Sequence, residues 1–237
     1  MKTTIYKADS RGYANHGWLK SHHTFSFAGY HDPSRMNFGA MRVLNDDTVA
    51  GGRGFDMHRH LNMEIVSIPL SGDLEHSDSM GNKTVIKEGD IQVMSAGTGV
   101  DHSEYNKNSD QEVKFLQIWI LPNKRPVDPR YDQLKINEDG KKNEFVQILS
   151  PNKSDEGVWI YQDAWFHIGE FIEETTTIYS LKKKGDGIFL FVLEGNAQIA
   201  GNLLNKRDAI GISDVDKVEI TIQSDSKILI IEVPMEF

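Results

Sequence analysis

Short apolar or alternating stretches, separated by Gly, Asn and Asp turns, run along most of the chain and predict strands. An alternating stretch places its apolar side chains on one face of a strand and its polar side chains on the other. The clearest stretches occupy residues 63–70, 74–79, 84–87, 91–94, 113–121, 158–161, 175–181, 188–193, 197–200, 209–212, 218–222 and 227–233. Many short strands at this spacing are typical of an all-β sandwich or barrel.

The strand pattern is interrupted once, from residue 122 to residue 154. Four prolines and a run of polar turn residues occur there, which favours a connecting segment. The two halves share a faint repeat, because residues 68–72 and 191–195 each read as a strand that enters a glycine turn. Two copies of one barrel would explain this repeat. We therefore predict an N-terminal barrel over residues 1–122, a connecting segment over residues 123–153 and a C-terminal barrel over residues 154–237.

Histidine is concentrated in the first half, where eight of the nine histidines lie within the first 104 residues. His58 and His60 are two positions apart in a glycine-bounded stretch, and His102 and Glu104 are two positions apart in another. Side chains two positions apart on a strand point to the same face. If the two strands face each other across a small barrel, three imidazoles and one carboxylate converge.

Three imidazoles and a carboxylate suit a divalent ion of iron, copper, nickel, manganese or zinc. Four protein ligands on an octahedral ion leave two positions for water, substrate or dioxygen, so we interpret the site as catalytic rather than structural. A single His-x-His pattern is usually a surface feature, but two such pairs beside glycine turns favour a metal centre. We predict that its ligands are His58, His60, His102 and Glu104.

The composition excludes several other kinds of chemistry. The chain has no cysteine, which rules out disulfides, zinc–thiolate sites and cysteine nucleophiles. The net charge is -9, and an acidic surface repels phosphate, so we expect no direct binding to nucleic acid or to a membrane. The chain opens without the apolar run of a signal peptide and has no stretch of about 20 apolar residues. These features predict a soluble, cytoplasmic protein.

The residues around the predicted ligands resemble the pirins, a branch of the cupin superfamily. Residues 52–64 and 89–106 approximate the two cupin motifs. Three further stretches are similar to pirin signatures: GWLKSHHTFSF at residues 17–27, FGAMRV at residues 38–43 and HSDSMGN at residues 76–82. The resemblance is strong from about residue 10 to residue 121 and thinner afterwards. It implies a bicupin of two stacked antiparallel β-barrels with metal only in the N-terminal one.

The sequence departs from the general cupin motifs at two positions. Gly72 lies one position beyond the usual glycine, and Ser95 replaces a usual proline. In pirins these departures are the pattern, and the resemblance makes Glu104 the fourth ligand. Applying the ligand spacing of the first barrel to the second leads to residues that do not suit a metal: Leu181, Lys183, Ile220 and Ile222.

The resemblance is closest to bacterial pirin-like proteins reported as quercetin 2,3-dioxygenases. It implies a metal-dependent dioxygenase that cleaves a flavonol with O2, with one divalent ion per chain and iron(II) as the favoured metal. Glu104 would be the general base that removes the proton of the substrate hydroxyl. Glu64 stands where many cupins have a ligand, and we expect it to orient a ligand imidazole.

The alternative is a non-enzymatic metal-binding protein, a pirin-like cofactor or redox sensor whose acidic surface binds a protein partner. An enzyme should have an apolar, reachable pocket over the metal, large enough for a bicyclic aromatic molecule. A regulator could have a narrow mouth and an exposed patch. His76 and Asp78, two positions apart, are expected on a solvated face of the barrel.

Overall fold

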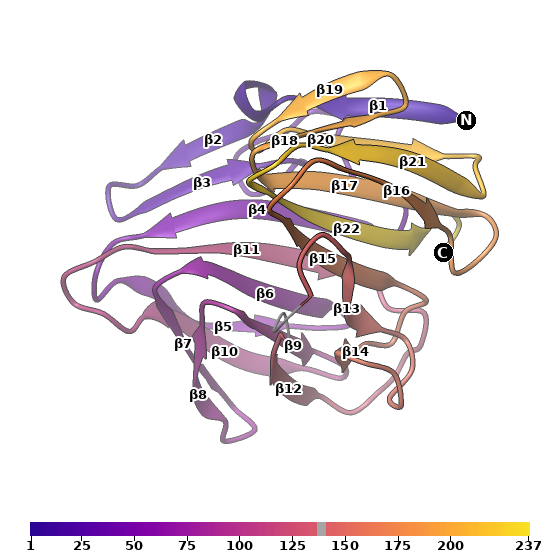
Figure 1. Cartoon of the computed structure of the whole chain (residues 1–237). Coiled ribbons are helices and arrows are strands. Elements are labelled where there is room, and N and C mark those ends of the chain that lie inside the picture. The colour runs from indigo at the N-terminus through magenta and orange to yellow at the C-terminus, as the bar shows by residue number, and fades with distance from the viewer. Residues whose placement is uncertain (137–140) are drawn as a thin grey trace.

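The computed structural model describes residues 1–136 and 141–237, and its regular elements are strands apart from one 3₁₀ turn, η1 (Ala8–Ser10). The strands form two units that lie against each other, one mainly from the first half of the chain and one mainly from the second (Figure 1). None of the described residues form a helix with the length and hydropathy that a membrane crossing requires.

The N-terminal unit consists of a seven-stranded and a four-stranded sheet. The larger sheet contains β2 (Gly12–Asn15), β3 (Leu19–His23), β4 (Met41–Val49), β6 (Glu64–Ser71), β9 (Asp90–Ser95), β11 (Val113–Ile120) and β12 (Arg130–Lys135). The smaller sheet contains β5 (Gly54–His60), β7 (Asp73–Asp78), β8 (Lys83–Lys87) and β10 (Val100–Asn106). Their orders are β12-β9-β6-β11-β4-β3-β2 and β5-β10-β7-β8. Leu74 of the smaller sheet and Phe115 of the larger one are fully buried in one core between them.

The C-terminal unit repeats this arrangement. Its larger sheet contains β1 (Lys2–Tyr6), β13 (Val146–Ser150), β14 (Val158–Trp159), β15 (Trp165–Phe171), β17 (Asp186–Glu194), β20 (Ala209–Ser213) and β22 (Ser226–Pro234). Its smaller sheet contains β16 (Thr175–Ser180), β18 (Asn196–Ile199), β19 (Asn202–Asn205) and β21 (Lys217–Ile222). The predicted all-β fold of two stacked barrels is confirmed. Each unit has the jelly-roll form, with two facing sheets that are not hydrogen-bonded into one closed cylinder.

Three strands extend these sheets from the start of the chain and from the predicted connecting segment. β1, at the start of the chain, pairs with β20 of the C-terminal unit. β12, in the segment that we predicted as a connection, pairs with β9 of the N-terminal unit, and β13 of the same segment pairs with β15. Residues 137–140 of that segment lie outside the described residues. The proposed boundaries of the two barrels stay a prediction.

The largest core lies between the two seven-stranded sheets. It contains Val66 and Ile118 from the N-terminal unit and Phe191 and Leu229 from the C-terminal unit, all fully buried. The two units therefore share one continuous apolar layer, and burial of this layer is a large favourable term in folding.

Phe38 anchors this layer by filling a space that two glycines leave open. Its ring lies 5.5 Å from that of Phe189. A Cβ atom added to Gly211 would lie 2.6 Å from the Phe38 ring, and one added to Gly187 would lie 2.7 Å from it. Only a residue without a side chain fits beneath the ring at these two positions.

We predict that Phe38→Ala lowers the free energy of unfolding by about 3–5 kcal/mol, as expected for a buried phenyl ring. Gly211→Ala should also destabilise, because its methyl group clashes with that ring. The double variant has no clash. Its loss of stability should therefore be smaller than the sum of the two single losses by at least about 1 kcal/mol. Urea unfolding of all four proteins measures this coupling, and simple additivity would contradict the proposed fit.

Candidate metal centre

Three histidines from two paired strands converge at one end of the N-terminal unit. In the antiparallel pair of β5 and β10, His58 lies opposite His102. The ring centroids are 4.4 Å apart for His58 and His102, 4.8 Å for His58 and His60, and 5.0 Å for His60 and His102. One potential ligand nitrogen from each ring lies within 4.8 Å of the others. This arrangement is a site that can hold one transition metal ion.

The protonation and the unpaired nitrogens of the buried imidazoles suit metal ligation. Burial and the neighbouring histidines lower the pKa of His102 to about 2, and burial and His58 lower the pKa of His60 to about 4. Both rings are therefore neutral at physiological pH, as ligation requires. Both ring nitrogens of His102 are buried without a hydrogen-bond partner, which is costly unless an ion binds there. His58 Nδ1 donates to the Asp56 carbonyl oxygen at 2.7 Å, so its Nε2 is left as the ligand atom.

Glu104 is buried on β10, two positions after His102, but it is not part of the group of three imidazoles whose ligand atoms lie within 4.8 Å of one another. The β5–β10 register shifts between His102 and Glu104, and both residues line one cavity. Ser67 Oγ donates to Glu104 Oε1 at 2.9 Å, and Gln117 Nε2 donates to Oε2 at 2.5 Å. Each carboxylate oxygen has a further lone pair, so these bonds leave Glu104 able to bind an ion. Burial raises its pKa to about 7.

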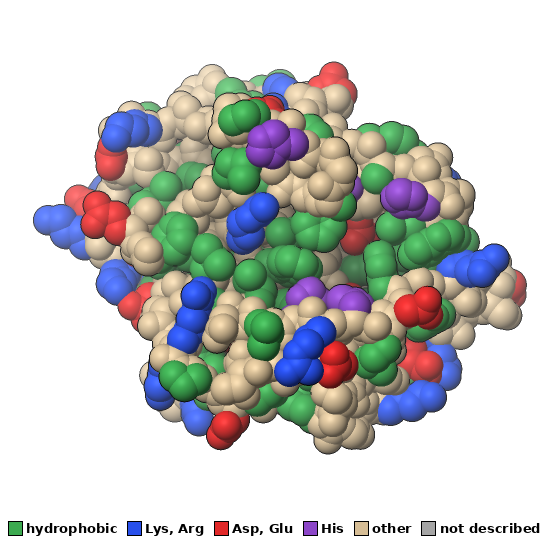
Figure 2. Space-filling model, turned by 180° about the vertical axis from the view of Figure 1, so that it is seen from behind, with side chains coloured by type: hydrophobic (Ala, Val, Ile, Leu, Met, Phe, Trp, Pro, Cys, Tyr) green, Lys and Arg blue, Asp and Glu red, His purple; other side chains and the backbone are tan. Residues whose placement is uncertain are grey.

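A cavity reaches the metal centre from the surface, and its wall includes Trp18, Phe27, Phe55 and Trp119. Its volume is about 440 Å³. Trp119 packs against His60 with ring centroids 4.9 Å apart, and Trp18 packs against Phe55 at 5.4 Å. The space-filling view shows histidine side chains in a hollow flanked by hydrophobic side chains (Figure 2). A drug-sized aromatic molecule typically occupies a pocket of this kind.

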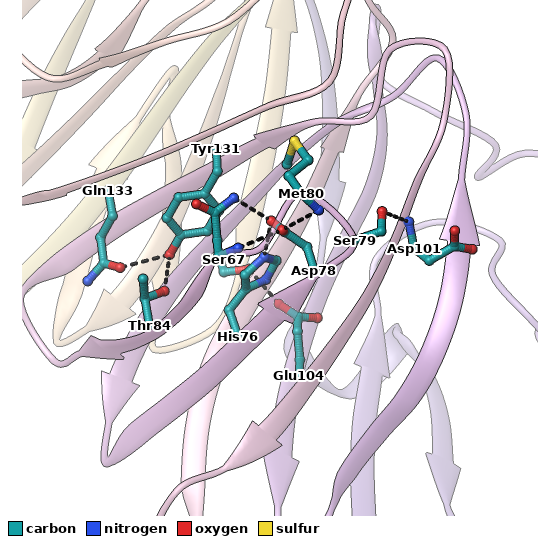
Figure 3. Close-up of polar contacts among 11 residues, drawn as sticks. Ser67, His76, Asp78, Ser79, Met80, Thr84, Asp101, Glu104, Tyr131 and Gln133 are labelled. Carbon is teal, nitrogen blue, oxygen red and sulfur yellow. Dashed lines mark hydrogen bonds and ion pairs between the residues drawn. The ribbon is translucent and has the colours of Figure 1, made fainter.

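Figure 3 shows a polar network around His76 and Asp78. His76 is fully buried, its Nε2 lies 3.0 Å from Asp78 Oδ2, and its ring lies 5.5 Å from His102 and 4.7 Å from Tyr131. The expectation of a solvated face for His76 and Asp78 is therefore wrong. Both share the inward face of β7 with Leu74. Leu74, an apolar residue two positions before His76, was the sequence signal that this face is buried.

Glu64 is not brought to the histidines. Its carboxylate accepts a hydrogen bond from Ser95 Oγ at 2.6 Å and is fully buried. Because Glu64 and Ser67 are three positions apart on β6, their side chains point to opposite faces. Ser67 points to the metal cavity, whereas Glu64 lies on the face that packs against the C-terminal unit, near Arg130 and the backbone of Tyr161.

The side chains that hold Glu104 in place, Ser67 and Gln117, were not identified from the sequence. They come from β6 and β11, whose runs read only as apolar strands. Their partnership with Glu104 depends on which strand faces which across the sandwich.

Comparisons with known proteins agree with this architecture. The chain matches the family model described as Pirin over residues 6–120 and the one described as quercetinase C-terminal cupin domain over residues 147–233. Quercetin 2,3-dioxygenase of Escherichia coli strain K12 is 40% identical over 97% of this chain and 98% of its own length. A pirin-like protein of Caulobacter vibrioides is 37% identical over 94% and 96%. The crystal structure of the bacterial pirin YhhW from Escherichia coli, in complex with nickel(II), superposes with a TM-score of 0.93 at 38% identity over 98% of this chain and 99% of that one.

Metal binding should release a proton from Glu104 at pH 6. In the metal-free protein this carboxyl holds a proton below its pKa of about 7, and an ion that binds its oxygen must displace that proton. We predict that nickel(II) affinity falls as pH drops below 7, and that Glu104→Gln releases about one proton fewer at pH 6. Calorimetric titration in two buffers of different ionisation enthalpy measures this difference. Equal proton release from both proteins would contradict ligation by Glu104.

Glu64 should affect stability rather than metal binding. Burial raises its pKa from 4.5 to about 7, so the folded state favours the protonated form, and the stability that this adds is lost as pH rises through 7. We predict that Glu64→Gln stabilises the metal-free protein by up to about 3 kcal/mol at pH 8 and has little effect at pH 4. Its nickel(II) affinity should match the wild type. Urea unfolding at both pH values tests this, and a weaker nickel site in the variant would indicate that Glu64 supports the ligands.

Proposed function

This chain belongs to the pirin family, and from that premise we propose that it is a metal-dependent dioxygenase that cleaves a flavonol of the quercetin type with O2. The observation that carries the proposal is the aromatic-walled cavity of about 440 Å³ that reaches three imidazoles and a buried carboxylate. Relatives that match nearly the whole chain are named quercetin 2,3-dioxygenase, which supports the substrate class.

We assign four side chains to one metal ion: His58, His60, His102 and Glu104. Three imidazoles and a carboxylate suit iron(II), which we propose as the native metal, and they also accept nickel, copper, manganese or zinc. The bound metal would supply coordination of the substrate oxygens and the one-electron chemistry that reaction with O2 requires.

Glu104 is the proposed general base. Its carboxyl lines the cavity and is ionised once a metal binds, so it can accept the proton of a substrate hydroxyl. Ser67 and Gln117 fix its orientation, so that one oxygen can take the proton of the flavonol 3-hydroxyl. The aromatic walls, Trp119 and Phe55 among them, exclude water from the deprotonated substrate and favour a flat ring system.

We predict that the metal-loaded protein consumes quercetin in an oxygen-dependent reaction and that Glu104→Gln lowers kcat by about 10²- to 10⁴-fold. Glu64→Gln is the matched control, because it makes the same chemical change at a buried carboxyl outside the cavity. Anaerobic metal loading, metal analysis and the loss of quercetin absorbance after oxygen is admitted measure this. Full metal occupancy without turnover would contradict the dioxygenase proposal and favour the metal-binding regulatory protein.

A further inference from the structure

A row of polar side chains crosses the inward face of the larger N-terminal sheet, opposite the strands that carry the histidines. Ser67 on β6 pairs with Gln117 on β11, Gln117 pairs with Asn45 on β4, and Asn45 pairs with His23 on β3. Asp47, two positions after Asn45, points to the same face of β4. Ser67 and Gln117 donate hydrogen bonds to Glu104. Asn45, His23 and Asp47 are not among the proposed metal ligands and do not hydrogen-bond Glu104.

These last three side chains line the cavity with atoms that lack partners. Asp47, Asn45 and His23 are 4%, 3% and 3% exposed. Asp47 Oδ1, Asn45 Oδ1 and His23 Nδ1 are buried and make no hydrogen bond of good geometry among the described residues, although the Ser21 side chain lies near the Asp47 carboxyl and Asn45 lies near the His23 ring. A buried polar atom left unpaired costs about 1–3 kcal/mol, and three such atoms on one wall indicate a surface that a ligand completes.

The wall that carries them is continuous with the metal centre. His23 stacks on Phe27 at 5.3 Å, Phe27 contacts Trp119 at 5.4 Å, and Trp119 contacts the ligand His60 at 4.9 Å. A flat molecule lying along these rings would reach the metal ligands of β5 and β10 at one end and the polar side chains of β3 and β4 at the other.

The charges around the cavity define what this wall can accept. The described residues that line it include two carboxylic acids, Asp47 and Glu104, and neither lysine nor arginine. An anionic group beside Asp47, such as a carboxylate or phosphate, would find neither lysine nor arginine to pair with among these lining residues. The unpaired oxygens of Asp47 and Asn45 are acceptors, so they suit neutral groups that donate hydrogen bonds.

We propose that Asp47, Asn45 and His23 form a second recognition site, which binds phenolic hydroxyls on the part of the substrate that does not coordinate the metal. The inference rests on the proposed function and narrows its substrate to neutral polyphenols with hydroxyls on the pendant ring. A hydroxyl donor there satisfies the carboxylate in a charge-assisted hydrogen bond. A substrate without that hydroxyl leaves the acceptors unpaired and is rejected.

The experiment compares quercetin, which has two hydroxyls on its pendant ring, with galangin, which has none there and the same metal-coordinating group. Wild type, Asp47→Leu and Asp47→Asn are assayed for kcat/KM with both flavonols. The dissociation constants of both are measured anaerobically on the nickel-loaded proteins. Nickel stoichiometry and urea unfolding establish that each variant is folded, and Asp47→Asn, which keeps the size and an acceptor oxygen, covers the case in which Asp47→Leu does not fold.

We expect the quercetin-to-galangin ratio of kcat/KM to fall at least about tenfold in Asp47→Leu and by less in Asp47→Asn, with the ratio of affinities falling in the same order. Turnover with an unchanged ratio in both variants would overturn the recognition site and leave the dioxygenase intact. Absence of turnover in the wild type, with the affinity ratio still dependent on Asp47, would overturn the dioxygenase and keep the recognition site.

Discussion

The antiparallel pairing of β5 with β10 is the constraint on which the metal centre depends. It sets His58 opposite His102 and brings His60 beside both. The close approach of the strands requires a glycine at position 54, because a Cβ there would lie 2.2 Å from the Glu104 carbonyl oxygen. A one-residue slip of this register would turn alternate side chains to the other face and disperse the imidazoles.

The rest of the fold supports this pairing from both sides. Ser67 and Gln117 hold Glu104 from the larger sheet, and the opposite faces of their strands pack against Phe191 and Leu229 of the C-terminal unit. That unit thus stiffens the sheet that positions the carboxylate. Its own interior is apolar, with a separate buried network in which Tyr179 hydrogen-bonds His167 and Glu232.

Sequence patterns predicted the all-β class and the shared face of His58 and His60, because both follow from the period of two along a strand. The convergence with His102 was expected from strands that face each other across a barrel, whereas β5 and β10 are paired neighbours in one sheet. The patterns did not predict the partners of Glu104, since the facing of strands is set by tertiary register rather than by local periodicity. The placement of Glu64 shows the same limit, because alternation does not say which face of β6 turns to the metal. β12 was missed because residues 130–135 are mostly polar and partly exposed.

The central claim is that one ion binds the three imidazoles together with Glu104. Diffraction from crystals of the nickel(II)-loaded protein, measured at the nickel absorption edge, tests it most directly. The account predicts one anomalous peak per chain, in coordination contact with His58, His60, His102 and a Glu104 oxygen at roughly 2.0–2.2 Å, while Gln117 still donates to the carboxylate. A peak elsewhere, or an ion held by the imidazoles with Glu104 bonded only to Ser67 and Gln117, would contradict it.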